Sequence, residues 1–392
     1  MIRSGALKEL KEKCLQQAGG NVKKANQLIV DTFREKILGT EKVNPRTISF
    51  KALFEGLVDL SNVDINNLVQ LNEAVASSAF TDTSTLLTHA VVIEPFELRK
   101  VDFGFLCTDG DAVITDDETV RGMTALGGLR RRLETQSYEE TDFEEKKVTI
   151  RKMDFGRGIS LTFEAIFNDR TGDIMDSAQN IGDDGVQHRE KMIIETLECL
   201  PRSAFGEATS RAFVLGGTAF VNTNFYNTNH SAIAGLDGQI NNNKVTGGIT
   251  EAGFASAFGC FAAMKDERGQ ILTINPEVVV VHKSNELTLG RLLLTEKAVG
   301  SAYNDVNMFG PKGAVTIRPV ATPFLATTAG LFYFGVPRRS MLWLWVQKPN
   351  SNTLSGNTDA AVKRKIVWEM YFNYYGGCGH RDYRYVVQGT TS

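Results

Sequence analysis

Apolar residues recur every three or four positions along several stretches of this chain, which is the spacing of one helix face. Residues 6–38 contain two such stretches on either side of a Gly-Gly pair, so two helices with a break at the glycines are predicted. Residues 50–60 and 66–78 are predicted to form further short helices. Residues 91–113 contain strand-like apolar runs instead.

The segment NDRTGDIMDSAQNIGDDGVQHRE (168–190) brings five aspartates, a glutamate and a histidine into one short stretch. An apolar stripe with helical spacing runs through it and beyond: Met175, Ala178, Gly182, Val186, Ile193, Leu197 and Leu200. This predicts one helix from about Asp173 to Leu200, capped by Thr171 or Asp169 and ended by Pro201.

A second, polar stripe with the same helical spacing lies about 100° from the apolar one. Its members are Asp173, Asp176, Asn180, Asp183, Gln187 and Glu190. Such a stripe is typical of a helix face that meets solvent or another chain, and a metal or acid/base site is the alternative. Asp183-Asp184-Gly185 lacks the alternating oxygens of an EF-hand, and His188-Arg189-Glu190 lacks the P-C-x-x-C partner of the zinc deaminases. The pattern therefore favours a contact or solvated face.

Residues 118–147 are highly charged and have few apolar anchors, so this stretch is predicted to project from any core. Long excursions of this kind are usually functional or disordered. Directly after it, Val148, Ile150, Ile159 and Leu161 alternate with period two in two runs. This predicts two strands joined through a hairpin.

The second half of the chain changes from helix to strand. Residues 250–268 predict a helix ended by Gly269, and EVVVVH predicts a strand that leads through a Ser284 cap into a helix ending near Ala298. The remaining predicted strands are VTIRPV, LFYFGV, MLWLWV, KIVWEMYFNYY and RDYRYVVQ, with NSNTLSGNTD as a connecting loop. Long helices followed by antiparallel strands indicate an α+β protein.

Composition limits the classes of function. The 392 residues are enough for two or three compact units, and 42% hydrophobic with 23% charged residues is ordinary for a soluble globular protein. The net charge of −3 argues against a chain that binds polyanions over its whole surface. Residues 1–50, however, contain ten Lys/Arg and five Asp/Glu. This basic arm could contact nucleic acid or an acidic partner, and a solvated amphipathic helix is the alternative.

Cysteine and histidine chemistry gives little support to an enzyme. The five cysteines form no CxxC pair, the five histidines lie far apart, and the common catalytic and nucleotide-binding motifs are absent. No signal peptide or membrane span is evident, so synthesis in a reducing cytoplasm is expected. A reactive thiol at Cys378 is the alternative to a tight strand connection formed by Gly376, Gly377 and Gly379. Core or interface packing, rather than a ligand cage, is predicted for three residues: Trp343, Trp345 and Trp368.

Several segments together resemble the tailed-phage major capsid proteins of the Hong Kong 97-type fold, and most closely the Mu-like head-subunit group. They are GISLTFEAIFNDRTGDIMDSAQNIGDDGVQHREKMIIETL, FYNTNHSAI, MKDERGQILTINPEVVVVHKSNELTLGRLLLTEK and VWEMYFNYYGGCGHRDYRYVV. The resemblance covers roughly residues 70–390. The sequence departs from the group at His282-Lys283, where prolines are common, and in the asparagines around His230.

The resemblance implies an α+β capsid fold with a specific division of the chain. Its implied parts are an N-terminal helical arm (1–60), a segment leading into the peripheral domain (61–117), an extended loop over a neighbouring subunit (118–157), the peripheral domain with a long spine helix (158–225), an axial domain (226–340) and return strands of the peripheral domain (341–392). The implied function is structural and non-catalytic, with no cofactor and no metal.

The resemblance also implies partners and a location. Copies of the chain would form hexamers and pentamers of an icosahedral head around double-stranded DNA, with portal and scaffold or decoration proteins as further partners and no membrane. The virion capsid would be made in the cytoplasm of the host bacterium. Candidate inter-subunit contacts join two groups of opposite charge: Arg130, Arg131 and Arg132 with Asp176, Asp183 and Glu190. An encapsulin-like nanocompartment shell and a soluble acid- or metal-dependent enzyme are the rival readings.

Overall fold

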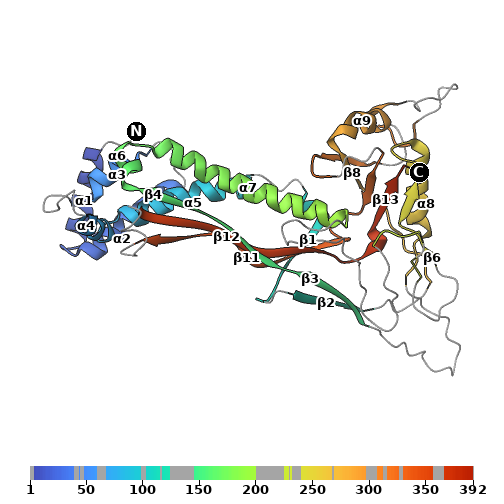
Figure 1. Cartoon of the computed structure of the whole chain (residues 1–392), viewed down its shortest axis with the longest axis horizontal. Helices are drawn as coiled ribbons and strands as arrows, with labels where there is room; N and C mark the ends of the chain where they lie inside the picture. Colours follow the sequence, from blue (N-terminus) through green and yellow to red (C-terminus); the bar gives the residue numbers. More distant parts are fainter. Residues whose placement is uncertain are drawn as a thin grey trace. The chain divides into compact units, whose positions relative to one another are not determined.

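The computed structural model describes residues 4–38, 44, 48–59, 68–98, 103–114, 117–123, 145–199, 225–228, 230–231, 240–266, 269–296, 307–311, 316–325, 330–355 and 366–391 (Figure 1). The chain divides into two compact units, and each is assembled from three separate stretches. Unit 1 comprises residues 1–101, 154–188 and 347–375, and unit 2 comprises residues 102–153, 189–346 and 376–392. Sequence order therefore does not separate the units.

Unit 1 is mainly helical. Its helices, apart from α7, are α1 (Ser4–Gln17), α2 (Val22–Leu38), α3 (Phe50–Leu57), α4 (Leu68–Ala76), α5 (Phe80–Leu98) and α6 (Phe163–Phe167). The predicted break between the first two helices is confirmed, and Gly19 and Gly20 both have positive φ, at 62° and 83°. The predicted short helices at 50–60 and 66–78 are confirmed as α3 and α4.

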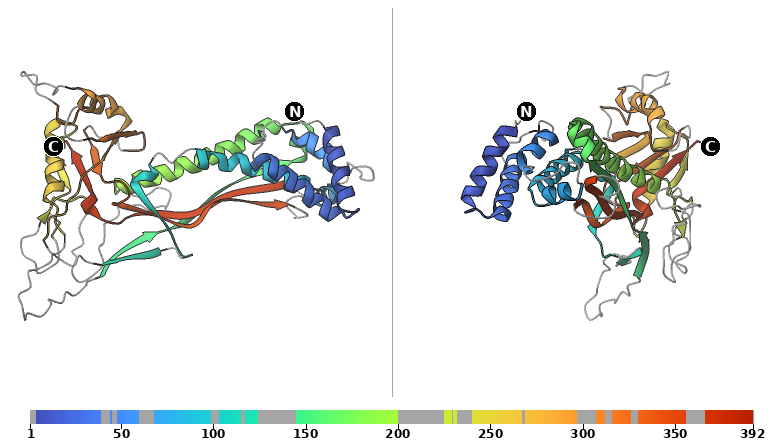
Figure 2. Two further views of the ribbon diagram at one scale, coloured as in Figure 1. Left: turned by 180° about the vertical axis from the view of Figure 1, so that it is seen from behind. Right: turned by 60° about the vertical axis from the view of Figure 1, so that its left-hand side comes forward.

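The core of unit 1 is built around α3, which packs against α1, α5 and α6 (Figure 2). The ring of Phe54 lies edge-on to the rings of Phe80, Phe163 and Phe167, with centroids 5.5, 6.5 and 5.8 Å away. Ser49 caps α3 by accepting a hydrogen bond from the Ala52 amide. These contacts bury the apolar face of α3 against α5 and against α6, which follows α3 by more than a hundred residues.

The strand-like reading of residues 91–98 was wrong, because these residues form the last turns of α5. Val91 and Val92 are 2% and 0% exposed, so this helix buries the β-branched side chains that suggested a strand. Burial in the core outweighs the small helix penalty of β-branched residues.

The long helix is α7 (Thr171–Leu197). The described members of the predicted apolar stripe, Met175 to Leu197, are all buried. Thr171 is the first helical residue rather than a cap, and its hydroxyl accepts from the Phe50 amide at 2.9 Å. The helix ends three residues before Leu200, and Cys199 follows with φ 56°.

A four-stranded sheet has the order β1 (Cys107–Asp111), β11 (Met341–Ser355), β12 (Ile366–His380) and β4 (Met153–Thr162). The predicted hairpin between the strands containing Val148 and Ile159 was wrong. β3 (Glu145–Arg151) pairs instead with β2 (Asp117–Met123) in antiparallel register, with Val120 opposite Val148. One residue, Lys152, separates β3 from β4, which is too short for a hairpin turn.

A five-stranded sheet forms the centre of unit 2. Its order is β7 (Lys244–Thr246), β13 (Val386–Thr390), β10 (Phe332–Gly335), β8 (Val278–His282) and β9 (Arg318–Thr322). Helices α8 (Glu251–Ala263) and α9 (Glu286–Leu294) contribute to the same hydrophobic cluster as Val279, Val281 and Phe332, so both cover one face of this sheet. A small ladder joins β5 (His230–Ser231) to β6 (Ile240–Asn241).

Several predicted boundaries in this half need correction. The helix predicted to Gly269 ends at Ala263, and α9 ends at Leu294 rather than near Ala298. Ser284 is not the cap of α9 but lies in a short 3-10 helix, Lys283–Asn285. The His282 side chain caps this helix by accepting a hydrogen bond from the Ser284 amide. The late strands are mixed, since β1–β11, β8–β9 and β7–β13 are parallel.

The glycine connection expected in the last strands was also wrong, as was the first part of the expected loop at 350–359, whose residues 356–359 lie outside the described residues. Residues 350–355 continue β11, and residues 376–379 lie inside β12. A Cβ at Gly376 would be 2.8 Å from the Leu344 carbonyl oxygen, and one at Gly377 would be 2.1 Å from that of Arg151. The glycines therefore allow close approach of neighbouring backbones rather than a turn.

Candidate functional site

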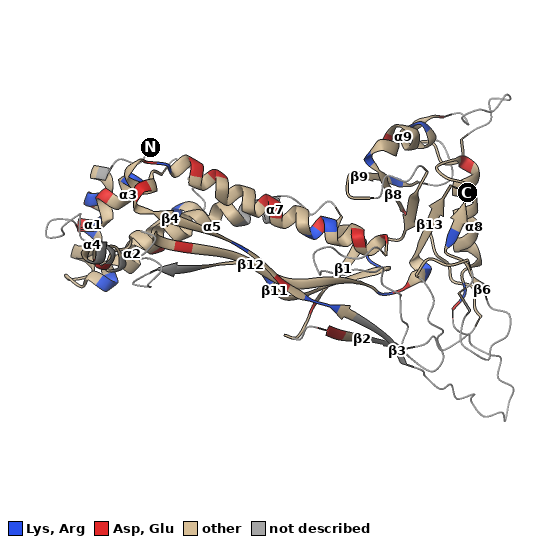
Figure 3. Cartoon of the chain, in the orientation of Figure 1, with Lys and Arg blue, Asp and Glu red and all other residues tan. Residues whose placement is uncertain are grey.

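The acidic stripe lies on the outer side of α7, as the helical spacing predicts. Asp173 and Asp176 are exposed, and Asp183 and Glu190 are partly exposed. Acidic residues recur along the helix in Figure 3. No group of three metal-ligating side chains occurs among the residues that the structure describes. His188 Nδ1 lies 2.6 Å from the Tyr374 hydroxyl.

The basic half of the predicted contact, Arg130, Arg131 and Arg132, lies outside the described residues. Its pairing with Asp176, Asp183 and Glu190 therefore stays a prediction. Near the stripe, Arg157 forms an ion pair with Asp184 at 3.0 Å, and both side chains are largely exposed. An exposed pair of this kind contributes only about 0–1 kcal/mol to stability.

The tryptophans of β11 and β12 are buried, which confirms their predicted role in packing: Trp343, Trp345 and Trp368 are 0%, 8% and 1% exposed. Sequence analysis missed the cation that lies on two of them. The Arg189 guanidinium is 4.8 Å from the Trp343 ring centroid and 4.7 Å from that of Trp345. The same group donates to Asp109 at 2.8 Å. The apolar stripe skips one helical turn between Val186 and Ile193, and Arg189 lies in that turn. This interruption was the feature of the sequence that could have indicated a buried cation.

A second buried cation, Lys152, lies where the β2–β3 ladder begins. Its side chain is 0% exposed, and its ammonium donates to Glu118 Oε2 and to the Val113 carbonyl oxygen, both at 2.6 Å. Charge-assisted hydrogen bonds offset part of the cost of burying the ammonium. Lys152 thus fixes the base of the predicted extended loop to the end of β1.

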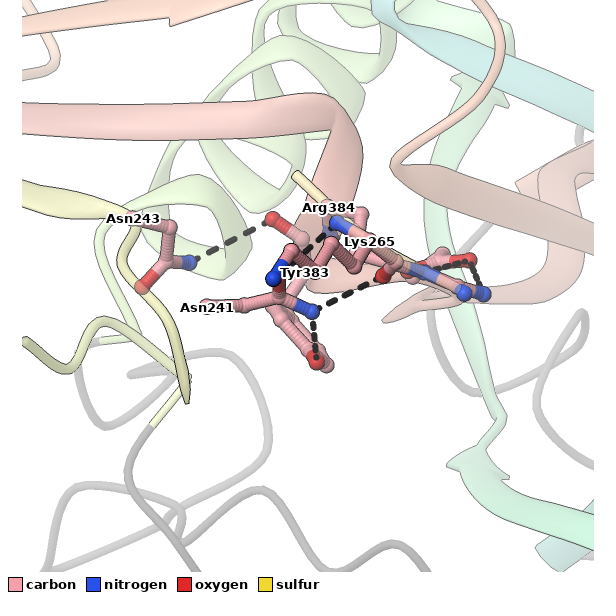
Figure 4. Close-up of polar contacts among 6 residues, drawn as sticks. Asn241, Asn243, Lys265, Tyr383 and Arg384 are labelled. Carbon is pink, nitrogen blue, oxygen red and sulfur yellow. Dashed lines mark hydrogen bonds and ion pairs between the residues drawn. The ribbon is translucent and has the colours of Figure 1, made fainter. Parts of the chain in front are cut away.

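A buried polar network joins β5, β6 and the 3-10 helix at Tyr383. Figure 4 shows its contacts among Asn241, Asn243, Lys265, Tyr383 and Arg384. The Asn243 side chain donates to the carbonyl oxygens of Phe225 and Tyr383, at 2.8 and 3.3 Å. Its Oδ1 lies 2.9 Å from His230 Nε2, and the His230 ring stacks on Tyr383 at 4.0 Å. Burial lowers the pKa of His230, against the opposing effects of these hydrogen bonds and of Asp382.

Asn241 and Arg384 complete this network. The Asn241 side chain exchanges two hydrogen bonds with the Lys265 backbone, both at 2.9 Å, and donates to the Tyr383 hydroxyl at 3.2 Å. Arg384 forms a bidentate pair with Asp382. Burial lowers the pKa of the guanidinium, but the Asp382 carboxylate outweighs this effect and raises it. The asparagines noted around His230 are therefore structural: they hold separate segments together.

Three cysteines of unit 2, Cys107, Cys199 and Cys378, lie close to other side chains. Burial raises the pKa of Cys199 to about 12, so its thiol remains protonated 3.1 Å from His380 Nε2. The Cys107 and Cys378 sulfurs are 3.7 Å apart, and both residues are buried. The hydrogen bond to Cys378 and burial both raise the pKa of Cys107 well above its usual value. Cys378 therefore lacks the exposure of a reactive thiol.

Within the part of the chain that the structure describes, no helix combines the length and apolarity needed to cross a membrane. A comparison with curated protein sequences gives no match.

The chain is similar to solved structures of phage and GTA capsids. The chain shares 10% identity with "Capsid structure of the Cyanophage P-SCSP1u", covering 74% of this chain and 88% of that one, with a TM-score of 0.45. It shares 12% identity with "Capsid of native GTA particle computed with C5 symmetry", covering 74% and 90%, with a TM-score of 0.47. It shares 12% identity with "Capsid of Ralstonia phage GP4", covering 72% and 86%, with a TM-score of 0.47.

The family is decided by the sequence itself. The pattern of the family described as "Phage capsid protein" matches residues 144–389. This match covers more than half of the chain. It runs from the start of β3 into β13 and includes α7. The chain therefore belongs to the phage capsid protein family, whose members form the protein shell of the virion.

Proposed function

We propose that this chain is a tailed-phage major capsid protein of the Hong Kong 97-type fold, within the Mu-like group. Many copies assemble as hexamers and pentamers into an icosahedral head that encloses double-stranded DNA. The family match over residues 144–389 carries this proposal. The long helix α7 and the five-stranded sheet covered by α8 and α9 support it.

The division of labour follows the parts named from the sequence. Residues 118–157 form the extended loop over a neighbouring subunit, and the anchored β2–β3 ladder at its base supports this role. Residues 158–225 and 341–392 build the peripheral domain, 226–340 the axial domain, and 61–117 leads into the peripheral domain. A two-stranded ladder alone is marginally stable, so a neighbouring copy stabilises the loop.

Arg130, Arg131 and Arg132 contact the acidic stripe of α7 in an adjacent subunit. The exposure of Asp176 and the partial exposure of Asp183 and Glu190 support this contact. Each exposed pair contributes about 0–1 kcal/mol, so the effect accumulates over many copies. Reversing the three arginines to glutamate lowers shell yield and the melting temperature of the particles. Unchanged yield and melting would refute the contact.

The basic arm, residues 1–50, lines the shell interior, where it meets packaged DNA or a scaffold protein. Lysines on the exposed sides of α1 and α2 support this placement. A chain lacking residues 1–40 then forms fewer shells, or shells that lose DNA. Full, stable virions from the shortened chain would exclude this role. Portal and decoration proteins are the remaining partners in the proposal.

Size and contents of the assembled particles separate this proposal from its rivals. The purified chain is examined by size-exclusion chromatography and negative-stain microscopy, and particles from infected cells are tested for nuclease-protected DNA. Shells that protect DNA support the phage head. Shells without DNA, formed in the absence of any phage, favour an encapsulin-like compartment, and a compact dimer favours a soluble enzyme.

A further inference from the structure

Large exposed apolar side chains in the described part of unit 2 fall into two groups, apart from Ile271. The first group, called the tip, is Val113 and Ile114, which are 70% and 79% exposed directly after β1. The second group contains Leu287, Leu294 and Met308, which are 79%, 71% and 52% exposed at α9. Single exposed apolar residues are common, but clusters rimmed by charge mark interaction sites.

The backbone holds the tip in place. The Ala112 amide donates to the Trp345 carbonyl oxygen at 2.8 Å, and the buried Lys152 ammonium donates to the Val113 carbonyl oxygen at 2.6 Å. Two branched apolar side chains are thus presented to solvent on a fixed support. A preformed contact of this kind loses less conformational entropy when it binds a partner.

The second group lies on one side of α9. Leu287, Arg291 and Leu294 are spaced by four and three residues, which places them on the same helix face. Met308 follows Asn307, whose side chain donates to the carbonyl oxygens of Leu292 and Thr295 at the end of α9, at 2.5 and 3.0 Å, so Met308 is held near this end of the helix. The α9 face is defined here as Leu287, Arg291, Leu294 and Met308.

The two groups have opposite charges beside them. The exposed Asp111 and Asp117 flank the tip. On α9, Glu286 is paired with Lys283 at 2.7 Å and Glu296 lies beyond the helix end, so Arg291 is the charge between the two leucines. Tip against tip would bring carboxylates together, and α9 face against α9 face would bring arginines together. Tip against α9 face combines apolar contact with opposite charges.

Within one copy the tip and the α9 face do not meet. α9 packs on β8 and β9, and Arg318 of β9 lies over the Phe105 ring just before β1, at 4.6 Å. β1 then runs parallel to β11 from the pair Cys107–Met341 to the pair Asp111–Trp345, away from this contact (Figure 1). The tip lies at the far end of the strand, so its partner face must come from another copy.

We propose that the tip of one copy binds the α9 face of the next copy in the shell, with Asp111 and Asp117 beside Arg291. Such a contact joins two different surfaces, and repetition closes a ring when the rotation between copies allows it. The inference rests on the proposed function, because it specifies one contact between copies in a capsomer.

A disulfide test reads this contact directly. The full chain carries Ile114→Cys together with Leu294→Cys, is assembled, and is oxidised with copper phenanthroline before denaturing electrophoresis. The expected result is a ladder of covalent oligomers. The matched controls are the two single variants and a chain with Ile114→Cys and Val22→Cys, since Val22 is 55% exposed on α2 in unit 1. None of these controls should give the ladder.

Charge reversal provides a second test of the contact between the tip and the α9 face. Arg291→Glu should abolish the ladder and reduce assembly, and adding Asp111→Arg with Asp117→Arg should restore both. All substituted positions are exposed, so melting of the free subunits should match the unmodified chain. Closed shells without the ladder would overturn the contact and leave the proposed function intact. A ladder from rings that never form shells would support the contact and refute the proposed function.

Discussion

Two buried cations of unit 2, Arg189 and Lys152, have partners that only the folded chain supplies. Arg189 lies between two indole rings and a carboxylate, and Lys152 between a carboxylate and a carbonyl oxygen. Arginine suits the first position because its flat guanidinium can stack on aromatic rings while its edge donates hydrogen bonds. Lysine suits the second, where a compact charge meets two oxygen acceptors.

Arg189→Met should therefore lower the free energy of unfolding of the free subunit by about 1–3 kcal/mol, from lost cation–π and ion-pair contacts. Arg189→Lys should recover only part of this loss, because an ammonium cannot stack in the same way. Urea unfolding measures both effects. Arg157→Met is the control, since its pair with Asp184 is exposed and its loss should cost under about 0.5 kcal/mol. Equal effects of the two Met variants would contradict this account.

Gly389 shows how one missing side chain permits a core contact. A Cβ there would be 2.1 Å from the Phe332 ring, in the centre of the five-stranded sheet. Gly389→Ala should destabilise the subunit by about 1–3 kcal/mol, as overpacking does elsewhere. Gly259→Ala is the matched change, because nothing lies within 4 Å of its Cβ on α8. It should be neutral or stabilise by up to about 1 kcal/mol. Thermal melting of both variants checks the difference in sign.

At the scale of elements, the helices could be read from sequence far better than the sheets. The two stripes of α7 depend only on the local repeat of the helix, so their burial and exposure follow from counting residues. Strand partners depend on contacts across long stretches of chain. β1 pairs with β11 more than two hundred residues later, and nothing in either apolar run specifies that choice.

The polar network around His230 was equally hidden from sequence. In the sequence, the asparagines near His230 indicated only a departure from a family pattern. Their hydrogen-bonding role depends on Phe225, Lys265 and Tyr383, which only the folded chain brings beside them. The signal that was present is the cluster Asn241-Asn242-Asn243. Side chains that both donate and accept can satisfy backbone groups where regular structure ends.

This network predicts a specific acid sensitivity. The folded pKa of His230 lies below its ordinary value of 6.5, so the neutral ring contributes stability above that pH. The contribution is lost as pH falls below 6.5 toward the folded pKa, because the unfolded chain then binds a proton that the folded chain does not. Denaturant unfolding at several pH values between 7.5 and 5.5 should show a steeper loss for the unmodified chain than for His230→Gln. Parallel curves would contradict this assignment.

At the scale of the whole molecule, each of the two units consists of three segments that alternate along the chain with segments of the other unit. α7, β11 and β12 each contribute residues to both units, so neither unit can be produced by cutting the chain at one point. The family match spans this interleaved region, whereas residues 1–143 lie outside it. Helices α1 to α5 therefore precede the segment that defines the family.

The most direct test of the central claim is electron microscopy of particles assembled from the purified full-length chain. The account predicts closed icosahedral shells whose surface resolves into six-fold and five-fold clusters of subunits. Particles that remain dimers or irregular aggregates, under conditions where the subunit is folded, would contradict it.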